Sequence, residues 1–80
     1  MKLPRDLSGA ELARALQKVG YRVTRQTGSH MRLTTSDGGE HHVTIPAHDS
    51  LRIGTLAGIL GDVAEHLHVS RDELASRLFG

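Results

Sequence analysis

Three short segments in the middle of the chain alternate polar and apolar side chains, and this pattern constrains the fold more than any other feature. They span about residues 21–27, 29–35 and 41–45, with turn residues at Thr27-Gly28 and Ser36-Asp37-Gly38-Gly39 between them. Successive side chains of a strand point to opposite faces, so each segment predicts a strand with one apolar face. Connections this short join neighbouring strands in opposite directions, and we therefore expect a three-stranded antiparallel sheet.

The predicted sheet has one apolar face and one polar face. The apolar face is expected to consist of Tyr21, Val23, Met31, Leu33, Val43 and Ile45. The polar face is expected to consist of Arg22, Thr24, Gln26, His30, Arg32, His42 and Thr44. An apolar sheet face must be buried against another layer, and amphipathic helices are the elements that can cover it.

Helical patterns flank the three strands on both sides. Ser8 and Glu11 form a capping box before a helix over about residues 9–19, and a second helix with an apolar stripe begins near Gly54-Thr55. A second capping box over residues 70–73 opens a short last helix. The sequence therefore predicts an α+β fold of α-β-β-β-α-α order, with the helices on one face of the sheet. This order and layering resemble the double-stranded-RNA-binding fold.

Length and composition limit the class of protein. The 80 residues suffice for one domain, so we treat residues 1–80 as a single domain. The chain has no cysteine, which excludes disulfides and thiolate zinc sites. Its apolar runs are all shorter than the ~20 residues of a membrane span. The first six residues lack the apolar core of a secretory signal, and we expect a cytoplasmic protein without membrane association.

Positive charge gathers in the first half of the chain. Residues 1–35 carry seven Lys and Arg against two acids, whereas residues 36–80 carry three against seven. A basic region of this kind suits a polyanionic partner such as RNA. Solvated charge on helix faces explains the same asymmetry equally well.

The polar face of the predicted sheet offers the side chains that RNA cleavage requires. Cleavage by the RNA's own 2′-hydroxyl needs a base for that hydroxyl, an acid for the leaving oxygen, and cations for the charged phosphorus centre. Histidine gains or loses a proton near neutral pH, and arginine has planar donors that match phosphate oxygens. His30, His42 and the arginines supply each type, although an ordinary solvated sheet face would look the same.

Several motifs, in order over residues 11–60, resemble the HicA family. They are Leu16-Gln17-Lys18-Val19-Gly20-Tyr21, Arg25-Gln26-Thr27-Gly28-Ser29-His30, Val43-Thr44-Ile45-Pro46-Ala47-His48 and Gly54-Thr55-Leu56. HicA proteins are toxins of bacterial and archaeal toxin–antitoxin pairs. The resemblance implies an mRNA-cleaving ribonuclease with its catalytic histidine at His30, neutralised by a HicB antitoxin. Two features depart from the family pattern: the absence of an aromatic residue in Met31-Arg32-Leu33, and a longer, acidic tail over 61–80.

The histidines differ in what the sequence predicts for them. His30 is expected to act as general base or acid. His42 is the first candidate for a second proton-transfer group, and a histidine with no catalytic role is an equally good interpretation of it. His48 follows Pro46 in a loop and either orients the site or caps the second helix. Zinc sites built from paired histidines are not expected, because the members of each pair point to different faces.

The cations are candidates for binding phosphate. Arg22 and Arg32 are expected on the polar face. Strict alternation places Arg25 on the covered face, from which it reaches RNA only if it curls around the strand end. Lys18 lies at the end of the first helix, where it either binds RNA or stabilises the helix dipole.

These observations favour a metal-independent endoribonuclease toxin that needs no cofactor and acts on mRNA. We expect its HicB-like antitoxin to cover the polar face and hide His30. A non-catalytic RNA-binding module and a protein-interaction domain are the alternatives, and the sequence leaves the oligomeric state open.

Overall fold

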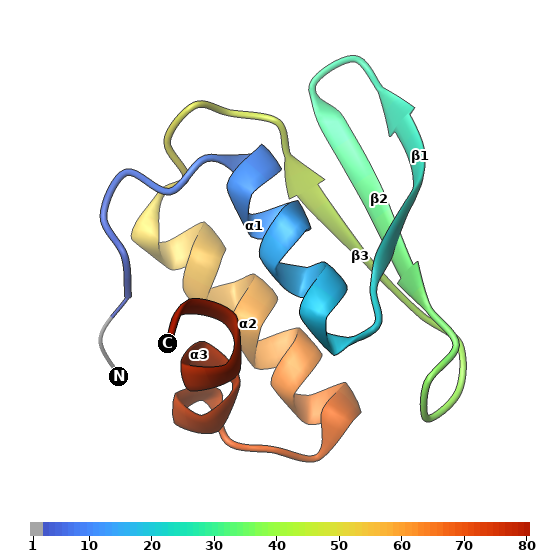
Figure 1. The fold of residues 1–80 in the computed structure, drawn as a ribbon. Helices are drawn as coiled ribbons and strands as arrows, with labels where there is room; N and C mark the ends of the chain where they lie inside the picture. Colours follow the sequence, from blue (N-terminus) through green and yellow to red (C-terminus); the bar gives the residue numbers. More distant parts are fainter. Residues whose placement is uncertain (1–2) are drawn as a thin grey trace.

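The computed structural model describes residues 3–80 and has the predicted order of elements (Figure 1). In chain order they are helix α1 (Gly9–Leu16), the 3-10 turn η1 (Gln17–Val19), strands β1 (Arg22–Thr27), β2 (His30–Thr35) and β3 (His41–Pro46), and helices α2 (Ile53–Leu67) and α3 (Arg71–Phe79). The sheet is antiparallel throughout, in the order β1-β2-β3. The predicted α+β class and the layout of the double-stranded-RNA-binding fold are confirmed.

The start of α1 follows directly from its local sequence. The Ser8 hydroxyl accepts a hydrogen bond from the Glu11 amide at 3.0 Å, and the Glu11 carboxylate accepts one from the Ser8 amide at 2.9 Å. The bond from the Ser8 backbone, with the side-chain bond adding to it, lowers the pKa of Glu11. The helix tightens into η1 and ends at Gly20, whose φ of 95° favours glycine.

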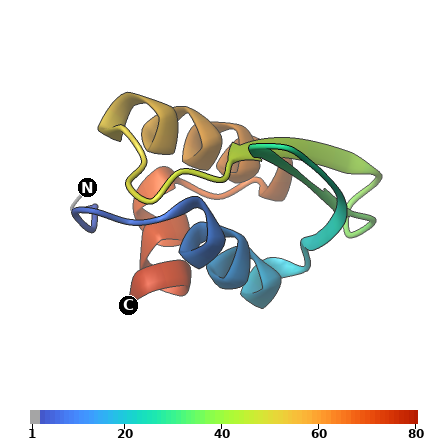
Figure 2. The same cartoon turned by 90° about the horizontal axis from the view of Figure 1, so that it is seen from above.

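The hydrophobic core lies between the sheet and the helices. The helices lie together beside the sheet (Figures 1 and 2), and Met31, Leu33, Val43 and Ile45 are buried on its inner face. The largest fully buried side chains come from every layer: Leu12, Leu16, Tyr21, Leu33, Ile45, Leu56, Leu60, Val63, Leu74 and Leu78. Helix α3 packs against α1, η1 and α2. Within residues 3–80, no helix is long and apolar enough to cross a membrane.

Strand β1 departs from the prediction because it contains a β-bulge. Val23 pairs with Leu33, but Arg25 rather than Thr24 pairs with Arg32, so Thr24 is an extra residue in the strand. An extra residue inverts the alternation beyond it. Gln26 therefore faces the helix side opposite Met31, which corrects its assignment to the polar face.

The bulge also corrects the predicted position of Arg25. Arg25 shares a face with its partner Arg32, which is the open face, and not the covered face that strict alternation predicts. Thr24 stays on the open face as predicted, since its hydroxyl lies 2.8 Å from that of Thr34. Val23 lies on the expected face but is 41% exposed, because β1 is an edge strand whose residues are all exposed.

Candidate functional site

His30 stands at the first position of β2, directly after a two-residue turn. Gly28 occupies the first position of that turn with a φ of 52°, a conformation that favours glycine. Met31 and Leu33 are buried on the helix side, so His30 and Arg32 project from the open face, and both are exposed. The fold thus holds the imidazole in solvent at one end of the open face.

The ring of His30 is accessible for proton transfer. Its Nδ1 lies 3.5 Å from the Ser29 hydroxyl, which is the one side-chain hydrogen bond of the ring within residues 3–80. Its neighbours across the two ladders are Thr27 on β1 and Pro46 on β3. The Nε2 atom therefore makes no hydrogen bond to any side chain in residues 3–80.

Three arginines share the open face with His30. Arg25 and Arg32 are directly opposite each other on adjacent strands, one position along the face from the Thr27–His30 pair, and Arg22 is farther along β1. Same-face neighbours along a strand are ~6.5–7 Å apart. No carboxylate or other side-chain partner pairs with any of the three among the described residues.

The Arg25–Arg32 pair is unfavourable for the sheet alone. Like charges directly opposite each other on neighbouring strands destabilise the pairing. An anion bound between the two guanidinium groups would remove that repulsion, because arginine's planar donors match phosphate oxygens. The arrangement is therefore suited to holding a phosphate beside an exposed imidazole.

The register separates His42 from His30. His42 pairs with Thr34, four residues along β2 from His30, which is about 13 Å along the sheet. Both nitrogens of its ring are engaged, Nδ1 with the Thr34 hydroxyl at 2.7 Å and Nε2 with the Glu40 carboxylate at 3.1 Å. The structure thus places His42 on the predicted face but does not bring it to the site of His30.

Lys18 also lies apart from this site. Its ammonium group donates a hydrogen bond to the Leu78 carbonyl at 3.0 Å, at the end of α3. The cation joins η1 to α3, where it also complements the negative end of a helix dipole. Of the predicted cations, the structure brings Arg25 and Arg32 close to His30 and leaves Lys18 with the helices.

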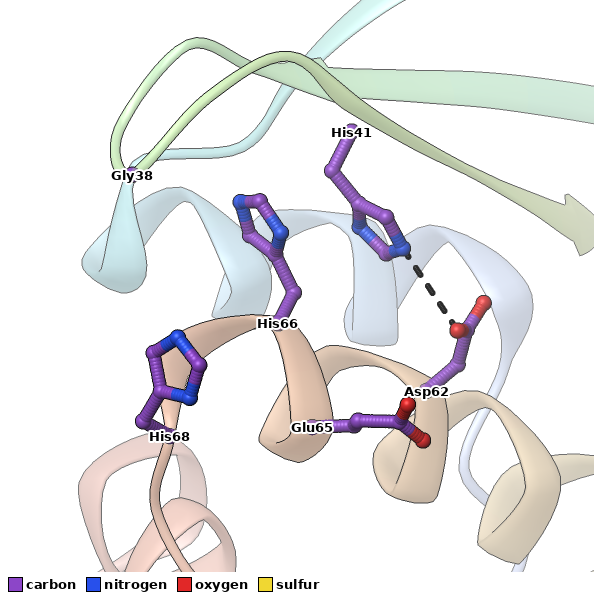
Figure 3. Close-up of a pocket in the computed structure, with 6 residues that line it drawn as sticks. All are labelled: Gly38, His41, Asp62, Glu65, His66 and His68. Atoms are coloured by element: carbon purple, nitrogen blue, oxygen red, sulfur yellow. Dashed lines mark ion pairs between the residues drawn. The ribbon is translucent and has the colours of Figure 1, made fainter.

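A second group of histidines connects the sheet to α2 (Figure 3). The rings of His41 and His66 are stacked, with centroids 4.4 Å apart and an interplanar angle of 9°. His41 Nδ1 is 2.7 Å from the Tyr21 hydroxyl, and its Nε2 is 3.5 Å from an Asp62 carboxylate oxygen. The His66 Nε2 donates to the Asp37 carbonyl at 2.8 Å, which fixes the β2–β3 turn on α2.

The contacts of these histidines hold the sheet and its β2–β3 turn against α2. Burial raises the pKa of Tyr21 to about 12, and the nearby Asp62 charge adds to the effect. Parallel stacked rings cannot both direct a nitrogen at one ion, and no group of three or more histidine or acidic side chains in residues 3–80 is arranged to hold a metal. As the alternation predicted, His41 faces the helices whereas His42 faces solvent.

Comparison with known proteins gives one match. The model of a family described as the HicA toxin of bacterial toxin–antitoxin systems matches residues 9–64. The matched segment runs from the first residue of α1 into α2, includes the whole sheet with His30, and leaves α3 outside. No curated protein and no solved structure matches the chain. Since the family match spans 56 of the 80 residues, the chain belongs to the HicA family of toxins from bacterial toxin–antitoxin pairs.

Proposed function

We propose that this chain is a metal-independent endoribonuclease, the mRNA-cleaving toxin of its toxin–antitoxin pair, with His30 as its general base or acid. Membership of a toxin family whose members typically cleave RNA supports the proposal. The single observation that carries it is the exposed His30 imidazole next to the cross-strand pair Arg25 and Arg32, whose side chains have no partner among residues 3–80.

These side chains suit each demand of the reaction. The 2′-hydroxyl of RNA attacks the neighbouring phosphorus, and a positioned imidazole that moves a proton in this step contributes about 10²–10⁴ in rate. Guanidinium groups aimed at the phosphate oxygens stabilise the extra negative charge of the transition state. All of these groups are the chain's own side chains.

The antitoxin is expected to be a HicB-like protein that covers the open face. This face is solvated, and its Arg22, Arg25 and Arg32 side chains have no partner within the described part of the chain, so an acidic protein would gain favourable contacts there. A complex whose contacts lie only on the helices would contradict this part of the proposal.

The experiment that tests the proposal is an RNA cleavage assay in excess EDTA. The purified chain is incubated with a plain mRNA transcript beside His30→Ala and a control, His68→Asn. The control removes an exposed histidine at the end of α2, where asparagine tolerates the local φ of 58°. We expect the wild type and the control to cut the transcript, and His30→Ala to be slower by about 10²-fold or more.

The principal alternative is a non-catalytic RNA-binding module, which the same arginines would serve. Intact RNA with all three proteins, together with retention of the RNA by each, would establish that alternative and reject the ribonuclease. Circular dichroism of each variant verifies that the fold is intact.

A further inference from the structure

A segment beyond β3 continues along the turn that precedes His30. Pro46, the last residue of β3, pairs with His30, and the amide of Ala47 then donates a 2.6 Å hydrogen bond to the Ser29 carbonyl. The ladder between β2 and β3 thus extends one residue past both strands. His48 is the next residue, beside the turn.

The backbone of His48 is held from a second side by α1. The Gly9 amide donates to the His48 carbonyl at 2.9 Å. Gly9 also lies so close to this segment that an added Cβ would overlap the Pro46 carbonyl. The sheet and the first turn of α1 together fix where His48 stands, although it belongs to no helix or strand.

The register places His48 much closer to His30 than His42 is. His48 follows Pro46, the partner of His30, by two residues, a span of at most ~7 Å along the chain. His42 lies about 13 Å along the sheet in the other direction. The His48 side chain is exposed and has no partner among residues 3–80, whereas both ring nitrogens of His42 are engaged.

We infer that His48 is the second proton-transfer group of the site and acts on the same phosphate as His30; this inference rests on the proposed ribonuclease function. One imidazole accepts the 2′-hydroxyl proton while the bond from O2′ to phosphorus forms. The other, as imidazolium, gives its proton to O5′ while the bond from phosphorus to O5′ breaks. The products are a 2′,3′-cyclic phosphate and a 5′-hydroxyl, and exchange with water restores both rings.

The first test compares pH profiles of RNA cleavage for the wild type, His48→Ala, His48→Gln and His42→Ala. The wild type should give a bell-shaped dependence of log kcat/KM on pH, because one group must be neutral and the other protonated. Both His48 variants should lose about 10²-fold or more and lack one limb of the bell. His42→Ala should keep both limbs.

The second test uses an RNA with sulfur in place of the bridging 5′ oxygen at one position. A thiolate leaves without an acid, so the variant that lacks the acid should cleave this substrate almost as fast as the wild type. Recovery by only one of His30→Ala and His48→Ala supports the pair. Recovery by both or by neither overturns it.

The outcomes separate this inference from the proposed function. If the wild type cuts RNA and His30→Ala does not, but His48→Ala keeps its rate or keeps both limbs, the inference fails and the ribonuclease stands. Loss of a limb in His42→Ala instead of the His48 variants also overturns it. If the wild type cuts no RNA, the proposed function itself fails.

Discussion

At the scale of single residues, the open face carries charges that do not serve the stability of the sheet. Arg25 and Arg32 oppose each other across β1 and β2, and no carboxylate in the described residues 3–80 neutralises either. A cross-strand pair of this kind costs roughly 0.2–1 kcal/mol. The proposed phosphate site would account for this cost.

Replacing Arg25 with glutamine should therefore stabilise the protein slightly and weaken its hold on RNA. We expect the free energy of unfolding to rise by up to about 1 kcal/mol, because the repulsion from Arg32 is removed. The slope of log affinity against log salt should become less steep by about 0.7 for a single-stranded RNA, since one phosphate contact is lost. Urea unfolding and salt-dependent RNA titration measure the two effects.

The control for Arg25→Gln is Arg71→Gln, which removes an arginine from the start of α3. It should leave the salt slope unchanged. An Arg25→Gln protein that is less stable and binds RNA as before would show that Arg25 supports the fold instead.

Tyr21 gives a second prediction at this scale, because it is the only tyrosine of the chain. Its pKa in the folded protein is raised to about 12 by burial, so the folded state favours the neutral phenol. The resulting stability is fully present below the unfolded-state pKa of about 10 and is lost as the pH rises toward 12.

An alkaline titration that follows tyrosinate absorbance measures this shift. The native protein should ionise near pH 12, whereas the protein in denaturant should ionise near pH 10. A native midpoint near 10 with the fold intact would contradict the buried contact between Tyr21 and His41.

At the scale of elements, the local sequence determines most of the structure. The Ser8–Glu11 box, the turn at Gly28 and the alternation of β2 and β3 each predict their element, because they depend on near neighbours in the chain. The bulge at Thr24 was not predictable, because Val23-Thr24-Arg25 has no glycine to mark it and the bulge is defined only by pairing with β2.

The same limit applies to the candidate site. Alternation assigns His42 to a face but does not give its position along that face, which depends on the register between β2 and β3. Alternation in the sequence predicted that His30 and Arg32 lie on the open face, and the family resemblance singled out His30. The face of Arg25, and the pairing of His30 with Pro46 two residues before His48, appear only when the strands are paired.

Deletion of Thr24 tests the bulge as an element. Without this residue, regular alternation keeps Arg25 opposite Arg32 and Gln26 opposite Met31, so the open face should lose Thr24 but keep its arginines and His30. We expect a folded protein that loses about 1 kcal/mol with the Thr24–Thr34 hydrogen bond and still binds RNA. Chemical-shift changes should be confined to β1 and β2. Loss of the fold or of RNA binding would show that the bulge is absent.

At the scale of the whole molecule, α3 lies outside the segment that matches the HicA family, yet it contributes to the core. Leu74 and Leu78 are buried, and the Leu78 carbonyl accepts the hydrogen bond from Lys18. A domain of this size has a small margin of stability, so we expect the fold to depend on α3. We do not expect α3 to contact RNA.

Leu74→Ala should therefore lower the free energy of unfolding by about 2–5 kcal/mol, through lost burial and the cavity left behind. The folded fraction should bind RNA with unchanged affinity, because the open face lies across the sheet from α3. Thermal unfolding and RNA titration at low temperature measure both. A change below about 1 kcal/mol would indicate that α3 is not part of the core.

The ends of the cleaved RNA test the central claim most directly. A short RNA is incubated with the protein in EDTA, and its fragments are identified by mass spectrometry beside the same RNA with 2′-O-methyl groups. Attack of the 2′-hydroxyl on phosphorus, with His30 as base or acid, predicts 2′,3′-cyclic phosphate and 5′-hydroxyl ends, with no cleavage of the methylated RNA. Fragments with 5′-phosphate ends, or cleavage of the methylated RNA, would contradict it.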